Sequence, residues 1–198
     1  MSLRALHEHD LGLTWIVAEL MERTSHALVD DGRVWLVDPV DEPEALERVA
    51  ALGKPAGVLQ LLDRHNRDCA ALAARLGVEH VRLPERLPDA PFVPFSAVSV
   101  PRWREVGLWW PARKALVVTE ALGTSELFTG GDRAVGVHLM LRLLPPRRLG
   151  GYAPEHLLVG HGPPIHGPAV ADGVQEALSR SLRDVPHVVT GFVRAARR

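Results

Sequence analysis

The chain of 198 residues contains a single cysteine, Cys69. One cysteine cannot form a disulfide within the chain, and sparse cysteine is typical of proteins from reducing compartments. The N-terminus lacks the apolar segment of a signal peptide, because the polar run from His7 to Asp10 interrupts it. No stretch approaches the roughly 20 apolar residues that span a bilayer. These absences predict a cytoplasmic protein with no membrane partner.

An excess of basic charge is also missing. Lys54 and Lys114 are the only lysines, and 23 Lys and Arg residues stand against 24 Asp and Glu residues, for a formal net charge of −1. A nucleic-acid-binding surface normally leaves a strong basic excess, so no nucleic-acid partner is expected. Hydrophobic residues make up 46% of the chain, which is close to the globular average. We expect a single domain over residues 1–198.

The glycine-rich motifs of nucleotide-binding proteins are absent as well. No P-loop or G-x-G-x-x-G pattern follows a predicted strand, which excludes those phosphate-binding loops. No nucleophile-elbow motif surrounds Cys69, and its helical spacing with Leu72 and Leu76 indicates burial. A cysteine-nucleophile hydrolase that pairs Cys69 with His65 or His161 is therefore disfavoured.

The first half of the chain contains regularly spaced apolar runs. Runs rich in β-formers predict strands at residues 15–18, 26–29, 34–37, 58–62 and 78–83. Apolar residues with helical spacing follow Glu42 and Asp68, and Gly53 and Gly77 end these two predicted helices. Asp31-Gly32 predicts a hairpin turn between two of the strands.

The second half repeats this organisation. Its apolar runs predict strands at residues 97–100, 106–110, 115–119 and 156–159. Residues 87–94 are proline-rich and predict a loop. The apolar segment 135–144 predicts a buried helix, which Pro145-Pro146 would end, and residues 174–181 predict a last amphipathic helix. The order of elements predicts a layered α/β domain.

Ionisable residues gather at the ends of the predicted strands. The octet LDRHNRDC, residues 62–69, directly follows the apolar run 58–61. Asp38, Glu120 and His161 each follow another predicted strand. In α/β proteins ligands bind beyond the carboxyl ends of strands, so these positions are where we expect a functional site.

This pattern resembles the metallo-β-lactamase fold, from about Trp15 to the helix after His161. The residues that carry the resemblance are four strand ends: 36–39 resembles the early aspartate turn, 59–69 the His-x-His-x-Asp-His loop, 107–120 the hairpin before the bridging aspartate, and 159–162 the loop with the final histidine. The resemblance implies a four-layer αββα sandwich with two mixed β-sheets.

The metal-binding motif departs from the family pattern. When Asp68 is aligned with the motif's aspartate, Arg64, Asn66 and Cys69 stand where the family has histidines, and Glu120 replaces the bridging aspartate. A guanidinium group cannot ligate a cation, and one asparagine does not provide the nitrogen and sulfur donors that zinc prefers. We therefore expect the dinuclear zinc centre, with its bridging hydroxide, to be absent.

One interpretation is a non-catalytic protein with a degenerate metal site and no cofactor. It would bind a small-molecule ligand or a protein partner, with a second copy of itself among the candidates, in the cleft that metals occupy in the family. Buried carboxylates without a metal need another positive partner. Arg64 would supply that charge by pairing with Asp38, Asp68 or Glu120.

The alternative is a metal-dependent hydrolase with one zinc or iron ion. Its ligands would be Asp68, Cys69, Glu120 and His161, with an activated water attacking a carbonyl or phosphoryl centre. Arg64 would then stabilise developing negative charge. Whether the protein is an enzyme stays open between these two interpretations.

Seven residues form the candidate site: Asp38, Arg64, His65, Asn66, Asp68, Glu120 and His161. Structural roles compete with functional ones at three positions of the octet. Asp68 also fits a helix N-cap, Cys69 also fits a small buried side chain, and His65 fits a surface position equally well.

The remaining histidines give weaker signals. His7 and His9, two residues apart, can chelate adventitious metal, but a mobile terminus explains them better. His166 follows the Gly-Pro loop and can join His161, although its spacing matches no specific motif.

Overall fold

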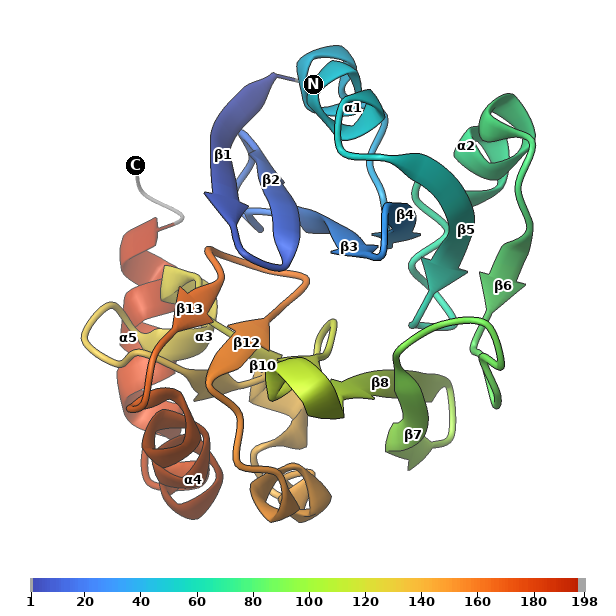
Figure 1. Cartoon of the computed structure of the whole chain (residues 1–198). Coiled ribbons are helices and arrows are strands. Elements are labelled where there is room, and N and C mark those ends of the chain that lie inside the picture. The colour runs from blue at the N-terminus through green and yellow to red at the C-terminus, as the bar shows by residue number, and fades with distance from the viewer. Residues whose placement is uncertain (1, 196–198) are drawn as a thin grey trace.

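The computed structural model describes residues 2–195, and it contains two mixed β-sheets (Figure 1). The first sheet has the order β1-β2-β3-β4-β5-β6. Its strands are β1 (Leu3–His9), β2 (Gly12–Val17), β3 (Thr24–Asp30), β4 (Arg33–Val37), β5 (Lys54–Gln60) and β6 (His80–Arg82). Neighbours are antiparallel from β1 to β4, and β4, β5 and β6 run parallel.

The second sheet has the order β13-β12-β9-β8-β7. Its strands are β7 (Val93–Val100), β8 (Trp103–Trp110), β9 (Ala115–Val117), β12 (His156–Leu158) and β13 (Ile165–His166). Only β9 and β12 are parallel within it. A separate two-stranded ribbon joins β10 (Leu122–Gly123) and β11 (Gly136–Val137).

Helices cover the outer faces of the sheets. They are α1 (Pro43–Ala50), α2 (Cys69–Leu76), α3 (Glu126–Thr129), α4 (Val170–Arg180) and α5 (Val185–Ala195), with short 3-10 turns at Pro111–Arg113, Leu139–Leu141 and Arg147–Gly151. In Figure 1, α1 and α2 lie beyond the first sheet, and α4 lies at the opposite end beyond the second. None of the helices in residues 2–195 has the length and apolar character needed to cross a bilayer.

Three hydrophobic clusters fill the spaces between the layers, because side chains alternate along each strand. Trp35 and Val37 of β4 pack between the two sheets, and Leu36 between them in sequence packs outward with α1 and α2. In the same way Val117 of β9 faces the first sheet, and Leu116 faces α4. The four layers predicted from the sequence are therefore present.

Strand direction places the functional site. The carboxyl ends of the parallel pair β4 and β5 and of the parallel pair β9 and β12 open into one region. The isolated bridges Arg23↔His161 and Leu62↔Glu105 connect the two sheets beside it. Segments far apart in the sequence therefore converge at one edge of the sandwich.

The predicted helix at 135–144 is wrong. Residues 136–137 form strand β11, and only Leu139–Leu141 make a 3-10 turn. Pairing with β10 uses the start of the segment, and Pro145-Pro146 prevents a helix from continuing beyond its end. Met140, Leu143 and Leu144 are exposed rather than buried.

Two other boundaries differ from the sequence-based expectation. The N-terminal residues expected to be mobile form β1, paired with β2 along most of its length. Strand β7 begins at Val93, inside the predicted loop 87–94. A proline such as Pro94 is tolerated there because β7 is an edge strand of its sheet.

Candidate functional site

Four of the candidate residues meet at the strand ends. Asp38 follows β4, His65 lies in the loop after β5, Glu120 follows β9 and His161 follows β12. All four side chains are buried or nearly so. The parallel strands deliver them to the same edge, so a compact polar cluster forms from four distant segments.

Asp38 is held firmly by the backbone around it. Its φ angle is 42°, in the left-handed region that few residues other than glycine adopt. The hydroxyl of Ser25 and the guanidinium of Arg67 donate to its carbonyl, and the N–H of Leu61 donates to Oδ1. The second carboxylate oxygen, Oδ2, is buried without a hydrogen-bond partner and points toward His65.

The imidazole of His65 lies between two carboxylates. Its Nδ1 atom is 3.5 Å from Oδ2 of Asp38, and its Nε2 atom is 3.1 Å from Oε1 of Glu120. Burial and the nearby Arg67 guanidinium lower the pKa of His65, but the two carboxylates raise it by more. The net pKa lies above its usual value, so His65 holds a proton readily between Asp38 and Glu120.

His161 is fixed in one tautomer. Its Nδ1 atom donates to the carbonyl oxygen of Met21 at 2.8 Å. Burial lowers the pKa of His161, so the ring is neutral and the proton stays on Nδ1. The Nε2 atom is then an electron-pair donor, and it is buried, has no hydrogen-bond partner and lies 3.8 Å from Oε1 of Glu120.

The two oxygens of Glu120 face different partners. Oε2 accepts a hydrogen bond from Arg64 at 2.5 Å, and Oε1 faces the Nε2 atoms of His65 and His161. Burial raises the pKa of Glu120, but interactions with His161, His65 and Arg64 lower it by more. Glu120 is therefore an anion at neutral pH.

A second buried carboxylate, Glu105, holds the Glu120 segment in place. Its Oε1 atom accepts hydrogen bonds from the backbone N–H groups of Thr119, Glu120 and Ala121 at 2.8, 3.1 and 3.1 Å. Burial raises the pKa of Glu105. The carboxylate thus fixes the turn that carries Glu120.

Arg64 lies over an aromatic ring at the rim of the cluster. Its guanidinium carbon is 4.0 Å from the centroid of the Trp103 ring, and Nη1 donates to the carbonyl of Arg102. The side chain is 41% exposed. The expected ion pair between Arg64 and a carboxylate is present, with Glu120 as the partner.

Arg67 is a second guanidinium close to the cluster that the sequence interpretation missed. It donates to the backbone carbonyls of Thr24, Asp38 and Gly160, at 2.6, 2.8 and 3.2 Å. These carbonyls come from the ends of three segments that surround the site. Burial lowers the pKa of Arg67. Its role is to join the loops that carry Asp38 and His161.

The structure does not bring Asn66, Asp68 and Cys69 into the cluster. Asn66 is exposed, and Oδ2 of Asp68 accepts a hydrogen bond from the N–H of Asp41. Asp68 is the N-cap residue of α2, but its side chain makes no capping hydrogen bond. Cys69 is fully buried in the hydrophobic cluster beneath α1 and α2, as expected for a small apolar side chain, and burial raises the pKa of its thiol to about 12.

Of the four ligands expected from the sequence, the structure brings Glu120 and His161 together, and the third residue of this group is His65 rather than Asp68 or Cys69. One ligand atom from each of His65, Glu120 and His161 lies within 4.8 Å of the others. Two ligands about 2.0–2.1 Å from a tetrahedral zinc ion lie roughly 3.3 Å apart. The separations of 3.1 and 3.8 Å from Oε1 of Glu120 bracket that value.

The surroundings of the three ligands also fit a cation. The Nε2 lone pair of His161 and the Oε1 anion of Glu120 are both electron-pair donors, and they face each other in a buried position. Positive charge between the two atoms would make this contact favourable. The Nδ1 atoms of His65 and His161 are directed at Asp38 and the Met21 carbonyl, as in the outer shell of metal sites.

Sequence signals for the missed residues are uneven. Glu105 lies in β8 between Trp103 and Gly107, and alternation places these positions on the face that packs against α4. A charged residue on a strand face that the pattern predicts to be buried is a signal from which Glu105 could have been found. Arg67 gives no comparable signal, because arginines are frequent throughout the chain.

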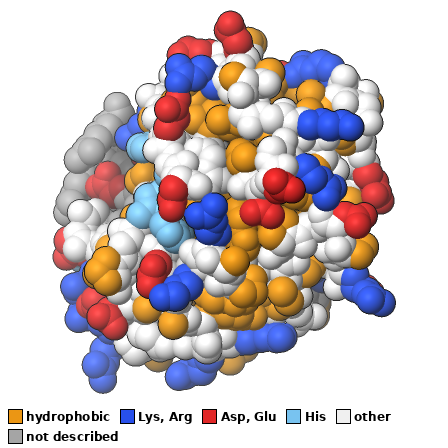
Figure 2. Space-filling model, viewed as in Figure 1, with side chains coloured by type: hydrophobic (Ala, Val, Ile, Leu, Met, Phe, Trp, Pro, Cys, Tyr) orange, Lys and Arg blue, Asp and Glu red, His pale blue; other side chains and the backbone are white. Residues whose placement is uncertain are grey.

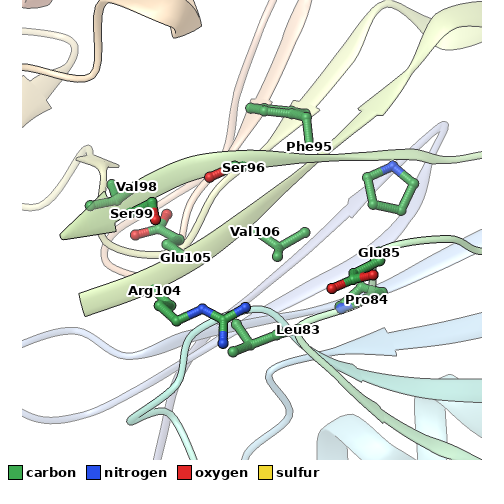
Figure 3. Close-up of a pocket in the computed structure, with 11 residues that line it drawn as sticks. Leu83, Pro84, Glu85, Phe95, Ser96, Val98, Ser99, Arg104, Glu105 and Val106 are labelled. Atoms are coloured by element: carbon green, nitrogen blue, oxygen red, sulfur yellow. The ribbon is translucent and has the colours of Figure 1, made fainter. Parts of the chain in front are cut away.

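A cavity of about 290 Å³ lies between β7, β8 and the segment after β6 (Figure 3). Its lining includes Glu105, Ser96, Val106 and Arg104, and the Arg104 side chain extends toward Leu83. None of the cluster residues at the strand ends lines this cavity. Glu105 therefore links the cavity on one side to the Glu120 turn on the other.

Comparison with solved structures identifies the fold. The DIM-1 metallo-β-lactamase is 13% identical and superposes with a TM-score of 0.56 over 91% of this chain and 99% of that chain. The BLEG-1 B3 metallo-β-lactamase is 15% identical, with a TM-score of 0.52 over 81% and 94%. TTHA1623 in a di-iron-bound form is 18% identical, with a TM-score of 0.53 over 76% and 93%.

The chain has the metallo-β-lactamase fold, as its resemblance implied. No protein-family model matches the sequence, and no curated protein matches it significantly. At these identities the likeness describes the fold alone, so the function has to be argued from the site.

Proposed function

We propose that the protein is a metallohydrolase-like domain that binds a single zinc or iron ion through His65, Glu120 and His161. The observation that carries this proposal is the contact between the His161 Nε2 lone pair and the Glu120 Oε1 anion. Three protein ligands plus a water molecule is the usual form of a catalytic zinc site. One fold neighbour is described in a di-iron-bound form.

Each residue of the site has a defined part in this function. When bound, the ion would lower the pKa of its water and polarise a carbonyl or phosphoryl oxygen. Asp38 and the Met21 carbonyl orient the two histidines. Glu105 fixes the backbone of Glu120, and Arg64 occupies Oε2 so that Oε1 stays available. The partly exposed guanidinium of Arg64 can stabilise negative charge on a substrate at the rim.

Metal content tests the proposal directly. Protein purified without a histidine tag and equilibrated with Zn²⁺ or Fe²⁺ is dialysed and analysed for bound metal. Glu120→Gln and His161→Ala should each bind one ion per chain fewer than the wild type. The matched controls Glu176→Gln and His187→Ala, at exposed positions, should bind as the wild type does. Equal metal content in Glu120→Gln and the wild type would contradict the proposal.

Hydrolysis is tested on the same set of proteins. Aryl ester and aryl phosphate substrates should be cleaved by the metal-loaded wild type, and Glu120→Gln should lose this activity together with the ion. Metal binding without any cleavage would support the site but not the hydrolase function.

A metal-free binding protein is the second candidate. It is favoured by the pairing of Glu120 with Arg64, and by His65, which can hold a proton between Asp38 and Glu120. In this function a small-molecule ligand would occupy the cavity that Glu105 lines. The candidate predicts no stoichiometric metal and no effect of a chelator on the melting temperature, whereas a chelator should lower the melting temperature of a single-metal protein.

A further inference from the structure

A second group of histidines lies where the edges of the two sheets meet. His156 of β12 and His166 of β13 are directly opposite each other in the antiparallel register. Their Nδ1 atoms are 2.8 Å apart, and their ring centroids are 5.0 Å apart. Two imidazole nitrogens at this distance share one proton, with one nitrogen as donor and the other as acceptor.

A third histidine reaches this pair from the other sheet. The ring of His9, at the end of β1, is 5.0 Å from the ring of His166. Its Nε2 atom bonds the hydroxyl of Thr14, and its Nδ1 atom is buried without a partner. His7 lies two residues earlier in β1, and period-two alternation places it on the same face of the strand.

The rings of His9 and His166 are in the form that binds metal ions. Burial, followed by repulsion from His166, lowers the pKa of His9 to about 4. Burial and the His156 ring lower the pKa of His166. The Asp10 carboxylate raises the pKa of both His9 and His166, so a negative charge lies near these rings. Neutral imidazoles beside an anion lose no net proton when they coordinate a cation, because the proton that two Nδ1 atoms share can move to Nε2 of its own ring.

We propose that His156 and His166 form a second transition-metal site where the edges of the two sheets meet. The ion takes the place of the proton that their Nδ1 atoms share. His9 lies beside this pair and would join it as a third donor by turning its unpartnered Nδ1 atom toward the ion. Imidazole donors favour Zn²⁺, Cu²⁺ or Ni²⁺ over Mg²⁺ and Ca²⁺.

The histidine group is independent of the cluster at the strand ends. His9 and His166 come from β1 and β13, the edge strands of the two sheets, whereas His65, Glu120 and His161 lie in loops. His166, for which the sequence left a place beside His161 open, lies in this group instead. Figure 2 shows histidine side chains together left of the centre of the visible face, in the area that Figure 1 gives to β1 and β13. Their position at the surface leaves a coordination place open to solvent.

The test uses the full chain with the first site disabled, so that the two proposals are measured separately. Tag-free Glu120→Gln protein is stripped with a chelator and titrated with Zn²⁺ by calorimetry. It should bind one ion per chain. Adding His156→Gln and His166→Gln should weaken binding by at least about tenfold, since even outer-shell changes at metal sites have effects of that size.

A spectroscopic measurement distinguishes ligands from bystanders. With Cu²⁺ in place of Zn²⁺, the electron paramagnetic resonance spectrum should show coupling to histidine nitrogens, and this coupling should be lost in the triple variant. The control His187→Gln, a histidine paired with Asp132 on another part of the surface, should leave affinity and spectrum unchanged. Unchanged Zn²⁺ affinity in a folded triple variant, checked by circular dichroism, would overturn the proposal.

Discussion

Arg64 bonds only one oxygen of Glu120, and the second oxygen of that carboxylate is left to His65 and His161. An arginine that took both oxygens, as bidentate pairs do, would have closed the site to a cation. The positive side chain and a metal ion are therefore compatible here, because each can use a different oxygen. The pair orients the carboxylate as well as neutralising part of its charge.

Replacing Arg64 with alanine should destabilise the protein only modestly. The Arg64 side chain is 41% exposed and that of Glu120 is 12% exposed, so solvent screens the pair. With the contact over Trp103, we expect a loss of about 1–2 kcal/mol in the free energy of unfolding. Urea denaturation measures it. Arg75→Ala, which breaks an exposed pair with Asp41, should lose less. A loss equal to that of Arg75→Ala would contradict a structural role for the Glu120 pair.

Metal binding at the cluster should release protons. His65 has a raised pKa between Asp38 and Glu120, so it is partly protonated near neutral pH and has to lose a proton before Nε2 coordinates. Affinity for Zn²⁺ should therefore fall as the pH is lowered through the pKa of His65. Calorimetry in buffers of different ionisation enthalpy measures the released protons. A Zn²⁺ affinity that stays constant between about pH 6 and pH 8 would show that His65 is not a ligand.

Replacing Glu105 with glutamine should disturb both stability and the site. The Oε1 atom of Glu105 accepts three backbone hydrogen bonds in a buried position, and Oε2 accepts one from the indole N–H of Trp103. Glutamine would weaken the bonds to Oε1 by removing the negative charge, and its NH₂ group would face the Trp103 N–H. We expect a loss of about 2–3 kcal/mol in the free energy of unfolding. Weaker metal binding should accompany it, because the Glu120 turn is no longer fixed. Glu176→Gln on the surface of α4 is the control and should change neither quantity.

Stability should decrease as the pH falls below about 6.5, the usual pKa of histidine. Burial lowers the pKa of His26 to about 3, where its ring bonds Thr14 and the Val159 carbonyl. Between these two values the unfolded chain binds a proton that the folded chain does not, so protonation favours unfolding. Each such group contributes a slope of about 1.4 kcal/mol per pH unit.

The variant His26→Gln isolates this contribution. Denaturation at several pH values measures how the free energy of unfolding depends on pH. Between the two pKa values this dependence should be weaker than in the wild type by about 1.4 kcal/mol per pH unit, the contribution of one proton. His187→Gln, at an exposed position, should keep the wild-type slope. An unchanged slope in His26→Gln would mean that His26 is already protonated in the folded protein.

Cys69 should be inert in the folded protein. Its thiol is fully buried and burial raises its pKa to about 12, so thiolate is scarce and inaccessible. A thiol reagent should modify it only in denaturant. Cys69→Ala should leave Zn²⁺ binding unchanged, in contrast to the ligand set first expected from the sequence. Loss of metal in a folded Cys69→Ala variant would restore that earlier set.

The sequence was sufficient to predict the fold and part of the site. Most strands and the helices α1, α2 and α4 follow from periodicity, because each buries one face of an ordinary layered core. Asp38, Glu120 and His161 follow from their places after buried strands. The pairing of Arg64 with Glu120 follows from charge, since a buried carboxylate needs a positive partner.

The remaining features depend on tertiary geometry that a linear pattern does not contain. Asp68 and Cys69 were aligned with ligands by motif position, but the start of α2 directs Cys69 into the core and Asp68 toward Asp41. His65, between the aligned positions, turns inward instead. Similarly, His9 and His166 are distant in sequence, and only the meeting of two sheet edges brings them together.

The convergence of β4, β5, β9 and β12 has a mechanical consequence. The edge where their ends meet is also where the two sheets would begin to separate from each other. An ion or ligand bound there would hold the ends of the two sheets together. Its loss would let the sheets separate at this edge and make the loops accessible to a protease. Resistance to limited digestion near residues 62–69 should then report occupancy, whether or not any substrate is turned over.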